Sequence, residues 1–162
     1  MPHIVQINVS NGGVPKRAVA EARIGAQGLE GDAVNHPKIH GGPERAVCLY
    51  SLERLLALQD EGHPVFPGAI GENLTLTGLD WGHLTAETVL EFGGSGGPLL
   101  QLTKPVTPCT TIAAYFKGEK GYRRIDEERR PGWARWYARV LREGRVQPGD
   151  AMTVQVEVRS DK

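Results

Sequence analysis

The sequence of 162 residues is poor in cysteine and in aromatic residues, and neither sign of charge is in excess. Two cysteines are too few for a disulfide scaffold, so we expect reduced thiols and a cytoplasmic protein. Lysine plus arginine and aspartate plus glutamate each number 19, which argues against a nucleic-acid partner. No apolar run approaches the roughly 20 residues of a bilayer span, and MPHIVQINVS at the start is unlike a signal peptide. We therefore expect neither a nucleic acid nor a membrane as a partner.

Glycine and proline are plentiful, with 21 and 11 residues, which is typical of many turns and short strands. Ser51 is expected to cap a helix over LERLLALQDEG. Alternating or short apolar runs predict strands in IVQINVS, AVAEARI, AVCLYS, NLTLTGL, TVLEF and LLQLT. Because these strands follow no βαβ order, we predict one mostly β domain over residues 1–162, a β-barrel-like fold with a few α-helices.

The end of the chain has two further periodic segments. Apolar residues at helical spacing predict an amphipathic C-terminal helix over about residues 133–143; they are Trp133, Trp136, Tyr137, Val140 and Leu141. This stripe would pack against the barrel or against a second copy of the chain, so a homodimer stays open. MTVQVEV then predicts a closing strand over about residues 151–158.

The two cysteines have different surroundings. In TKPVTPCTTIAAYF, Thr107 suits a helix N-cap and Pro108 the first helical position, which places Cys109 in the first turn of a short helix. Free N–H groups and the helix dipole favour a thiolate there, so the position activates the sulfur. The alternative is a thiol that packs under the helix as a small hydrophobe. Cys48 lies within the apolar run AVCLYS, and we interpret it as an inert core thiol.

A polar loop, HPKIHGGPERA, is a candidate anion site. Gly41 and Gly42 let the backbone approach a ligand closely, and His40 and Arg45 could then bind an anion. His36 and His40 are four residues apart, but a proline and glycines oppose a helix here, and no cysteine or acidic residue has zinc-site spacing. A solvated polar turn is the alternative.

Two other segments have polar residues that suit a ligand. Glu72 and Asn73, in GAIGENL, could hold the edge of a heterocycle or cap neighbouring backbone groups. Arg123 and Arg124, in GYRRIDEERRPG, could bind a phosphate if they converge, although a run of mixed sign is usually a solvated surface. The sequence has no GxGxxG, Walker loop or nucleophile elbow.

Taken in order, GLEGD, HGGPERAV, GENLTLTGL, TKPVTPC and GWARWYARVLREGRVQPGD resemble the MOSC family, named for the C-terminal domain of molybdenum cofactor sulfurase. The resemblance spans roughly residues 4–158. It is strongest to small stand-alone bacterial members, some of which reduce N-hydroxylated bases. It implies a β-rich, barrel-like fold and a role with the molybdenum cofactor (molybdopterin). The family is also associated with pyridoxal phosphate binding.

The resemblance also implies roles for single residues. The family's characteristic cysteine matches Cys109, which would be the catalytic residue and would ligate molybdenum or hold a persulfide. The cofactor-binding residues implied by the matching motifs and the nearby arginines are His40, Gly41, Gly42, Arg45, Glu72, Asn73, Arg123 and Arg124.

Three functions stay open, two of them implied by the resemblance and a third that does not depend on it. The first is an oxidoreductase that reduces a small N-hydroxylated substrate and depends on an external electron-donor protein, because no flavin or iron–sulfur motif is present. The second is a non-redox carrier of the cofactor, or of sulfur accepted from a sulfur donor. The third is a β-barrel domain that binds another small anion.

Overall fold

A computed structural model describes residues 1–33 and 41–155 of the chain. The strands are β1 (His3–Val9), β2 (Arg17–Val19), β3 (Ala22–Gly25), β4 (Gly28–Leu29), β5 (Val47–Ser51), β6 (Leu74–Thr77), β7 (Val89–Phe92), β8 (Leu99–Pro105), β9 (Trp136–Arg142), β10 (Gly144–Val146) and β11 (Met152–Gln155). The helical elements of this part are the α-helix α2 (Leu52–Asp60) and the 3-10 helices η1 (Pro43–Arg45), η2 (Trp81–His83), η3 (Thr110–Tyr115) and η4 (Gly121–Ile125). None of these helices is long and apolar enough to cross a bilayer.

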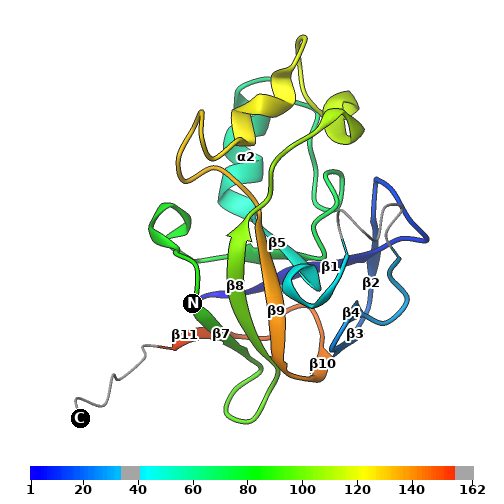
Figure 1. Cartoon of the computed structure of the whole chain (residues 1–162), viewed down its shortest axis with the longest axis vertical. Helices are drawn as coiled ribbons and strands as arrows, with labels where there is room; N and C mark the ends of the chain where they lie inside the picture. Colours follow the sequence, from blue (N-terminus) through cyan, green and yellow to red (C-terminus); the bar gives the residue numbers. More distant parts are fainter. Residues whose placement is uncertain (34–40, 156–162) are drawn as a thin grey trace.

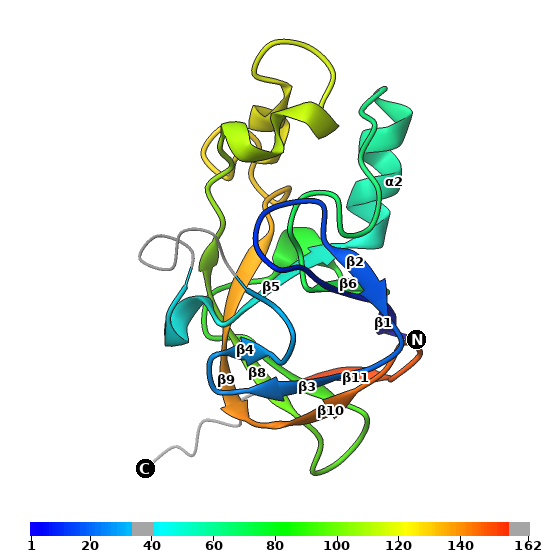
Figure 2. The ribbon, with the colours of Figure 1, turned by 90° about the vertical axis from the view of Figure 1, so that its right-hand side faces the viewer.

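Eight strands form one strongly curved sheet in the order β11-β7-β8-β9-β5-β6-β1-β2. Neighbouring strands are antiparallel except for the parallel pair β5 and β6. A bridge between His3 and Ala151 brings the β11 end of the sheet back to β1 (Figure 2). A smaller sheet has the order β10-β3-β4. The structure therefore confirms the mostly β, barrel-like prediction.

The helical elements α2, η3 and η4 gather beyond one end of the curved sheet (Figure 1). All five residues of β5 are buried between β9 and β6, and the chain passes directly from this strand into α2. The Ser51 side chain accepts a hydrogen bond from the N–H of Arg54 at 3.1 Å, which confirms the predicted cap. The fully buried Tyr50 of β5 donates a hydrogen bond from its hydroxyl to the carbonyl of Trp133 at 2.7 Å. This bond links the sheet to the segment that precedes β9.

The predicted C-terminal helix over residues 133–143 is wrong, because residues 136–142 form strand β9. Trp136 pairs with Leu49 on β5 and with Pro105 on β8, so the strand lies in the interior of the sheet. An interior strand can be buried on both faces, which produces consecutive apolar residues that fit helical spacing equally well. The predicted closing strand is present as β11, and its residues 156–158 lie outside the described part.

We predict that Trp136→Ala lowers the free energy of unfolding by about 3–5 kcal/mol, because the indole is only 8% exposed. The matched control is Leu141→Ala on the same strand, whose side chain is 49% exposed and whose loss is expected to cost under about 1 kcal/mol. Urea unfolding of both variants measures the two values. Equal losses would contradict the assigned interior position of Trp136.

Candidate functional site

A cavity of about 140 Å³ is lined by residues of β5, β9 and η3 and of several connecting loops. Among the residues predicted for a site, it brings together Cys109, Arg45 and Asn73. Its lining residues come from six segments, within residues 13–16, 32–33, 45–48, 70–73, 106–112 and 135–137, and not every residue of these ranges reaches the cavity. Because these segments are far apart in sequence, the fold alone creates the site.

Cys109 lies at the cavity, and its side chain is exposed. The residue has extended backbone angles (φ −138°, ψ 177°) and precedes η3, so the helix begins later than predicted and is of the 3-10 type. A six-residue 3-10 helix aligns few peptide dipoles, so the accessibility of the sulfur matters more than the dipole. The thiol donates to the Thr111 hydroxyl at 3.3 Å. Its exposure rules out the alternative of a thiol packed under a helix.

Cys48 is buried on β5, opposite Tyr137 of β9, and the two form a small apolar cluster with Val106. Burial raises the pKa of the Cys48 thiol to about 11. Cys48 is buried, as predicted, but it also forms part of the cavity wall, which was not predicted. The protein therefore presents two thiols to one cavity, one exposed and one buried.

We predict that alkylation with iodoacetamide labels Cys109 at least about tenfold faster than Cys48 at pH 8. A pKa of about 11 leaves roughly one Cys48 in a thousand as the reactive thiolate at this pH. Mass-spectrometric site mapping over time gives both rates. Equal labelling of the two thiols in the folded protein would contradict the assignment.

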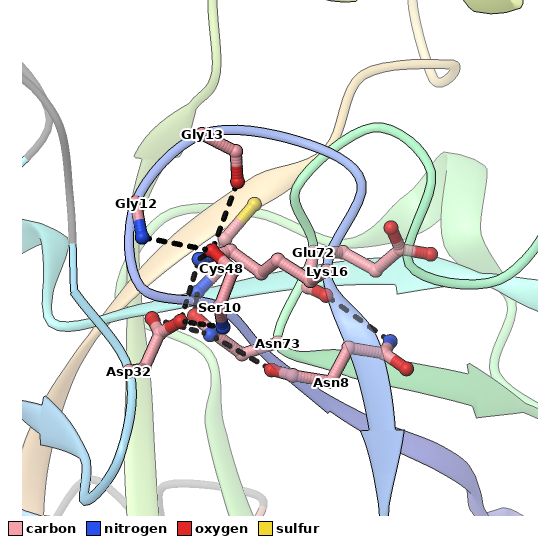
Figure 3. Close-up of polar contacts among 9 residues, drawn as sticks. All are labelled: Asn8, Ser10, Gly12, Gly13, Lys16, Asp32, Cys48, Glu72 and Asn73. Atoms are coloured by element: carbon pink, nitrogen blue, oxygen red, sulfur yellow. Dashed lines mark hydrogen bonds and ion pairs between the residues drawn. The ribbon is translucent and has the colours of Figure 1, made fainter.

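A buried polar network supports one wall of the cavity (Figure 3). The Lys16 ammonium lies 2.6 Å from Asp32 Oδ1, and their side chains are 8% and 10% exposed. The other carboxylate oxygen of Asp32 accepts a hydrogen bond from Asn73 Nδ2 at 2.9 Å. Asn73 Oδ1 in turn accepts from the Cys48 N–H at 3.0 Å. Sequence analysis missed Lys16 and Asp32 as site residues, although Asp32 ends the GLEGD motif.

Positive charge predominates in the cavity wall. Arg135 is 6% exposed and donates from Nη1 to the Ile70 carbonyl at 2.6 Å, while its Nε has no partner among the described residues. The Arg45 guanidinium lies 5.8 Å from the centre of the Tyr137 ring. With Lys16, the wall has three cations, and Asp32 is the single carboxylate among its residues. An anionic ligand would relieve this imbalance.

Glu72 is fully buried behind the wall and is not a cavity-lining residue. Its Oε2 accepts a hydrogen bond from the Thr75 hydroxyl at 3.1 Å, and its Oε1 has no partner among the described residues. Burial raises the pKa of Glu72 to about 7, against the opposing effect of backbone hydrogen bonds. The carboxyl group therefore gains or loses its proton near neutral pH.

We predict that the Glu72→Gln variant lacks a pH dependence of stability that wild type shows between about pH 4.5 and 7. The folded-state pKa of Glu72 lies above the ordinary value of 4.5, so the proton stabilises the folded state. This stabilisation is complete below 4.5 and disappears as the pH rises through 7. The difference between the two proteins should change by on the order of 3 kcal/mol across this window.

Chemical unfolding at a series of pH values tests this prediction, with the exposed Glu119→Gln as the matched control. Parallel pH profiles for wild type and Glu72→Gln would show that the carboxyl group titrates normally in the folded protein.

The other predicted residues lie elsewhere. Gly41 and Gly42 line a neighbouring open hollow that shares Arg45 with the cavity. Arg123 and Arg124 lie on η4 and do not reach the cavity, and Arg124 is 3.5 Å from Glu61. His36 and His40 lie outside the described residues. Within the described part, no group of three histidine, cysteine or acidic side chains could hold a metal ion by itself.

Comparison with known proteins identifies the family. Protein YflK of Bacillus subtilis is 31% identical over 139 residues, which are 85% of this chain and 60% of that protein. A protein named Reductase from Gibberella moniliformis is 30% identical over 119 residues, which are 71% of this chain and 20% of that protein. The chain thus spans less than two thirds of the length of each of these relatives.

The structural comparison agrees. The crystal structure of YiiM from Geobacillus stearothermophilus has a TM-score of 0.73 at 26% identity, and the match covers 96% of this chain and 76% of that one. The family model of the MOSC domain matches residues 36–153, which include Arg45, Asn73 and Cys109 of the cavity. The chain therefore belongs to the MOSC family, which is associated with binding of the molybdenum cofactor.

Proposed function

We propose that this chain binds the molybdenum cofactor through Cys109 and, when loaded, reduces small N-hydroxylated compounds with electrons from an external donor protein. The observation on which the proposal rests is the pairing of an exposed thiol with a cationic cavity in a MOSC chain. The name Reductase of one relative agrees with this reaction class.

The residues of the cavity fit such a cofactor. A cysteine thiolate is a soft ligand of the kind that suits a thiophilic metal, and Cys109 is accessible to one. The described residues provide no three-ligand metal cluster, so the protein would contribute one thiolate and the cofactor its own ligands. The buried Arg135, with its free Nε, and Arg45 would bind the anionic part of the cofactor. The bound cofactor would supply the redox chemistry.

The protein's own residues would hold and orient the ligand. The hydrogen bond from Arg135 to the Ile70 carbonyl fixes the guanidinium against the loop that precedes β6. The hydroxyl of Thr111 lies 3.3 Å from the Cys109 sulfur; it accepts from the thiol and would donate to the thiolate that ligates the metal, which orients the sulfur in both states. Cys48, Val106 and Tyr137 form an apolar patch of the wall that limits the access of water from that side.

A carrier function is the second candidate, and the exposure of Cys109 favours it. A persulfide on an exposed thiol could be passed to a partner without any movement of the core. In this case the partner would be a sulfur donor in place of an electron donor, and the protein would show no reductase turnover.

We predict that Cys109→Ala, made in a host that synthesises the cofactor, loses bound molybdenum to background and at least about 100-fold of its reductase activity. Because the side chain is exposed, its removal should leave thermal unfolding almost unchanged. The matched control is Ser95→Ala in the exposed turn between β7 and β8, which should keep both metal and activity. Metal analysis, pterin analysis and turnover with reduced methyl viologen are the measurements.

The outcomes separate the candidates. Wild type that takes up no molybdenum but accepts sulfur on Cys109 from a donor would favour the carrier. Wild type that shows neither metal nor persulfide would refute both, and a domain that binds another small anion would remain.

A further inference from the structure

We infer that Lys16 is the acid that protonates the leaving hydroxyl oxygen when an N-hydroxylated compound is reduced in the cavity, an assignment that rests on the proposed function. Lys16 and Cys109 line the same cavity of about 140 Å³. The two residues come from distant parts of the sequence, and the fold places both at this one space.

The ammonium group of Lys16 is held in place with donor capacity left over. Asp32 Oδ1 lies 2.6 Å away, and the Ser10 hydroxyl lies at the longer distance of 3.5 Å (Figure 3). Asp32 is itself fixed, because it accepts hydrogen bonds from the Ser10 N–H at 2.9 Å and from Asn73. An ammonium group has three N–H donors, so at least one is available to a ligand in the cavity.

The proposed reduction needs such a donor. Reduction of R–NH–OH consumes two electrons and two protons, breaks the N–O bond and yields R–NH₂ and water. Hydroxide is a poor leaving group, so a proton must reach the oxygen as the bond breaks. The Lys16 N–H would supply this proton and be restored from solvent. The second proton reaches nitrogen from solvent, and both electrons come from the external donor.

The other groups of the wall are less suited to this step. Arg45 and Arg135 do not release protons under ordinary conditions. Tyr137 and Cys48 would become buried anions on releasing a proton, and burial accordingly raises their pKa values to about 12 and about 11, whereas a lysine becomes neutral. Asp32 already accepts three hydrogen bonds as a carboxylate. Lys16 is the remaining acid that the geometry fixes in the wall.

The test compares two leaving groups in Lys16→Met, which shortens the unbranched side chain by one atom and removes the ammonium group. The substrate is whichever of benzohydroxamic acid, phenylhydroxylamine and N-hydroxyguanidine the wild type reduces fastest, and the comparison compound is its O-acetyl ester. Acetate leaves without a proton on the departing oxygen. We predict that Lys16→Met lowers kcat at least about 100-fold for the hydroxyl compound and less than about threefold for the ester.

Further variants separate acid catalysis from structural damage. The exposed Lys117→Met is the matched control and should behave as wild type. Rates are expressed per bound molybdenum. If the unpaired Asp32 prevents folding, Lys16→Met/Asp32→Asn removes both charges and should give the same ratio between the two compounds. Lys16→Arg keeps the ion pair but releases no proton, so it should also lose turnover of the hydroxyl compound.

Binding to the cofactor-free protein gives a second readout. Wild type should bind the N-hydroxylated compound about tenfold more tightly than its deoxygenated product, because the product lacks the oxygen that accepts from Lys16. Lys16→Met should bind the two equally.

Equal losses of kcat for the hydroxyl compound and the ester in Lys16→Met would overturn the assignment of Lys16 but not the proposed function. The same conclusion would follow if wild type showed no binding preference, or if Lys16→Met kept it. Loaded wild type without turnover of any of the compounds would overturn the proposed function, and the assignment of Lys16 with it.

Discussion

The hydrogen bonds of Asn73 are the constraint on which the cavity depends. Its N–H donates to the Cys48 carbonyl at 2.7 Å, and its carbonyl accepts from the Asn8 N–H at 2.8 Å. Its side-chain amide joins the Cys48 N–H to Asp32. Asn73 thus continues the pairing of β6 with β5 and β1, and it fixes the carboxylate that holds Lys16. Because an aliphatic side chain would leave these buried groups unpaired, the residue is difficult to replace.

The loop that ends at Asn73 positions Lys16 a second time, through the backbone. The Lys16 N–H donates to the Gly68 carbonyl at 2.8 Å. Gly68 has φ +91°, and a Cβ at this position would collide with the Lys16 carbonyl, so only glycine allows the close approach. The same loop offers the Ile70 carbonyl to Arg135 and buries Glu72. One short loop therefore holds two cations of the wall and a carboxyl group whose pKa burial raises to about 7.

The sequence was sufficient where the signal is local and insufficient where distant segments combine. Ser51 and the leucines after it predict α2 because a cap and helical spacing act within one turn. Trp136 and Tyr137 misled the analysis because β5 and β8 enclose β9 on both sides, which no local pattern reveals. Cys109 was recognised by its motif, whereas Lys16 lies in a segment without one, and Arg135 was not predicted although it lies within GWARWYARVLREGRVQPGD. Their role arises from burial beside Asp32 and Ile70, which only the fold brings near.

The charges of the cavity contrast with those of the rest of the molecule. The formal net charge is zero, and several cations outside the cavity have nearby carboxylates, as Arg130 has Glu61 and Arg142 has Glu91. Within the wall, one carboxylate faces three cations, two of them largely buried. A buried charge without a counter-charge lowers the stability of the folded state. The excess of cations in the cavity wall therefore does not stabilise the fold by itself. An anion bound beside Cys109, as proposed, would supply negative charge, and cations that the protein has already desolvated and fixed would stabilise it.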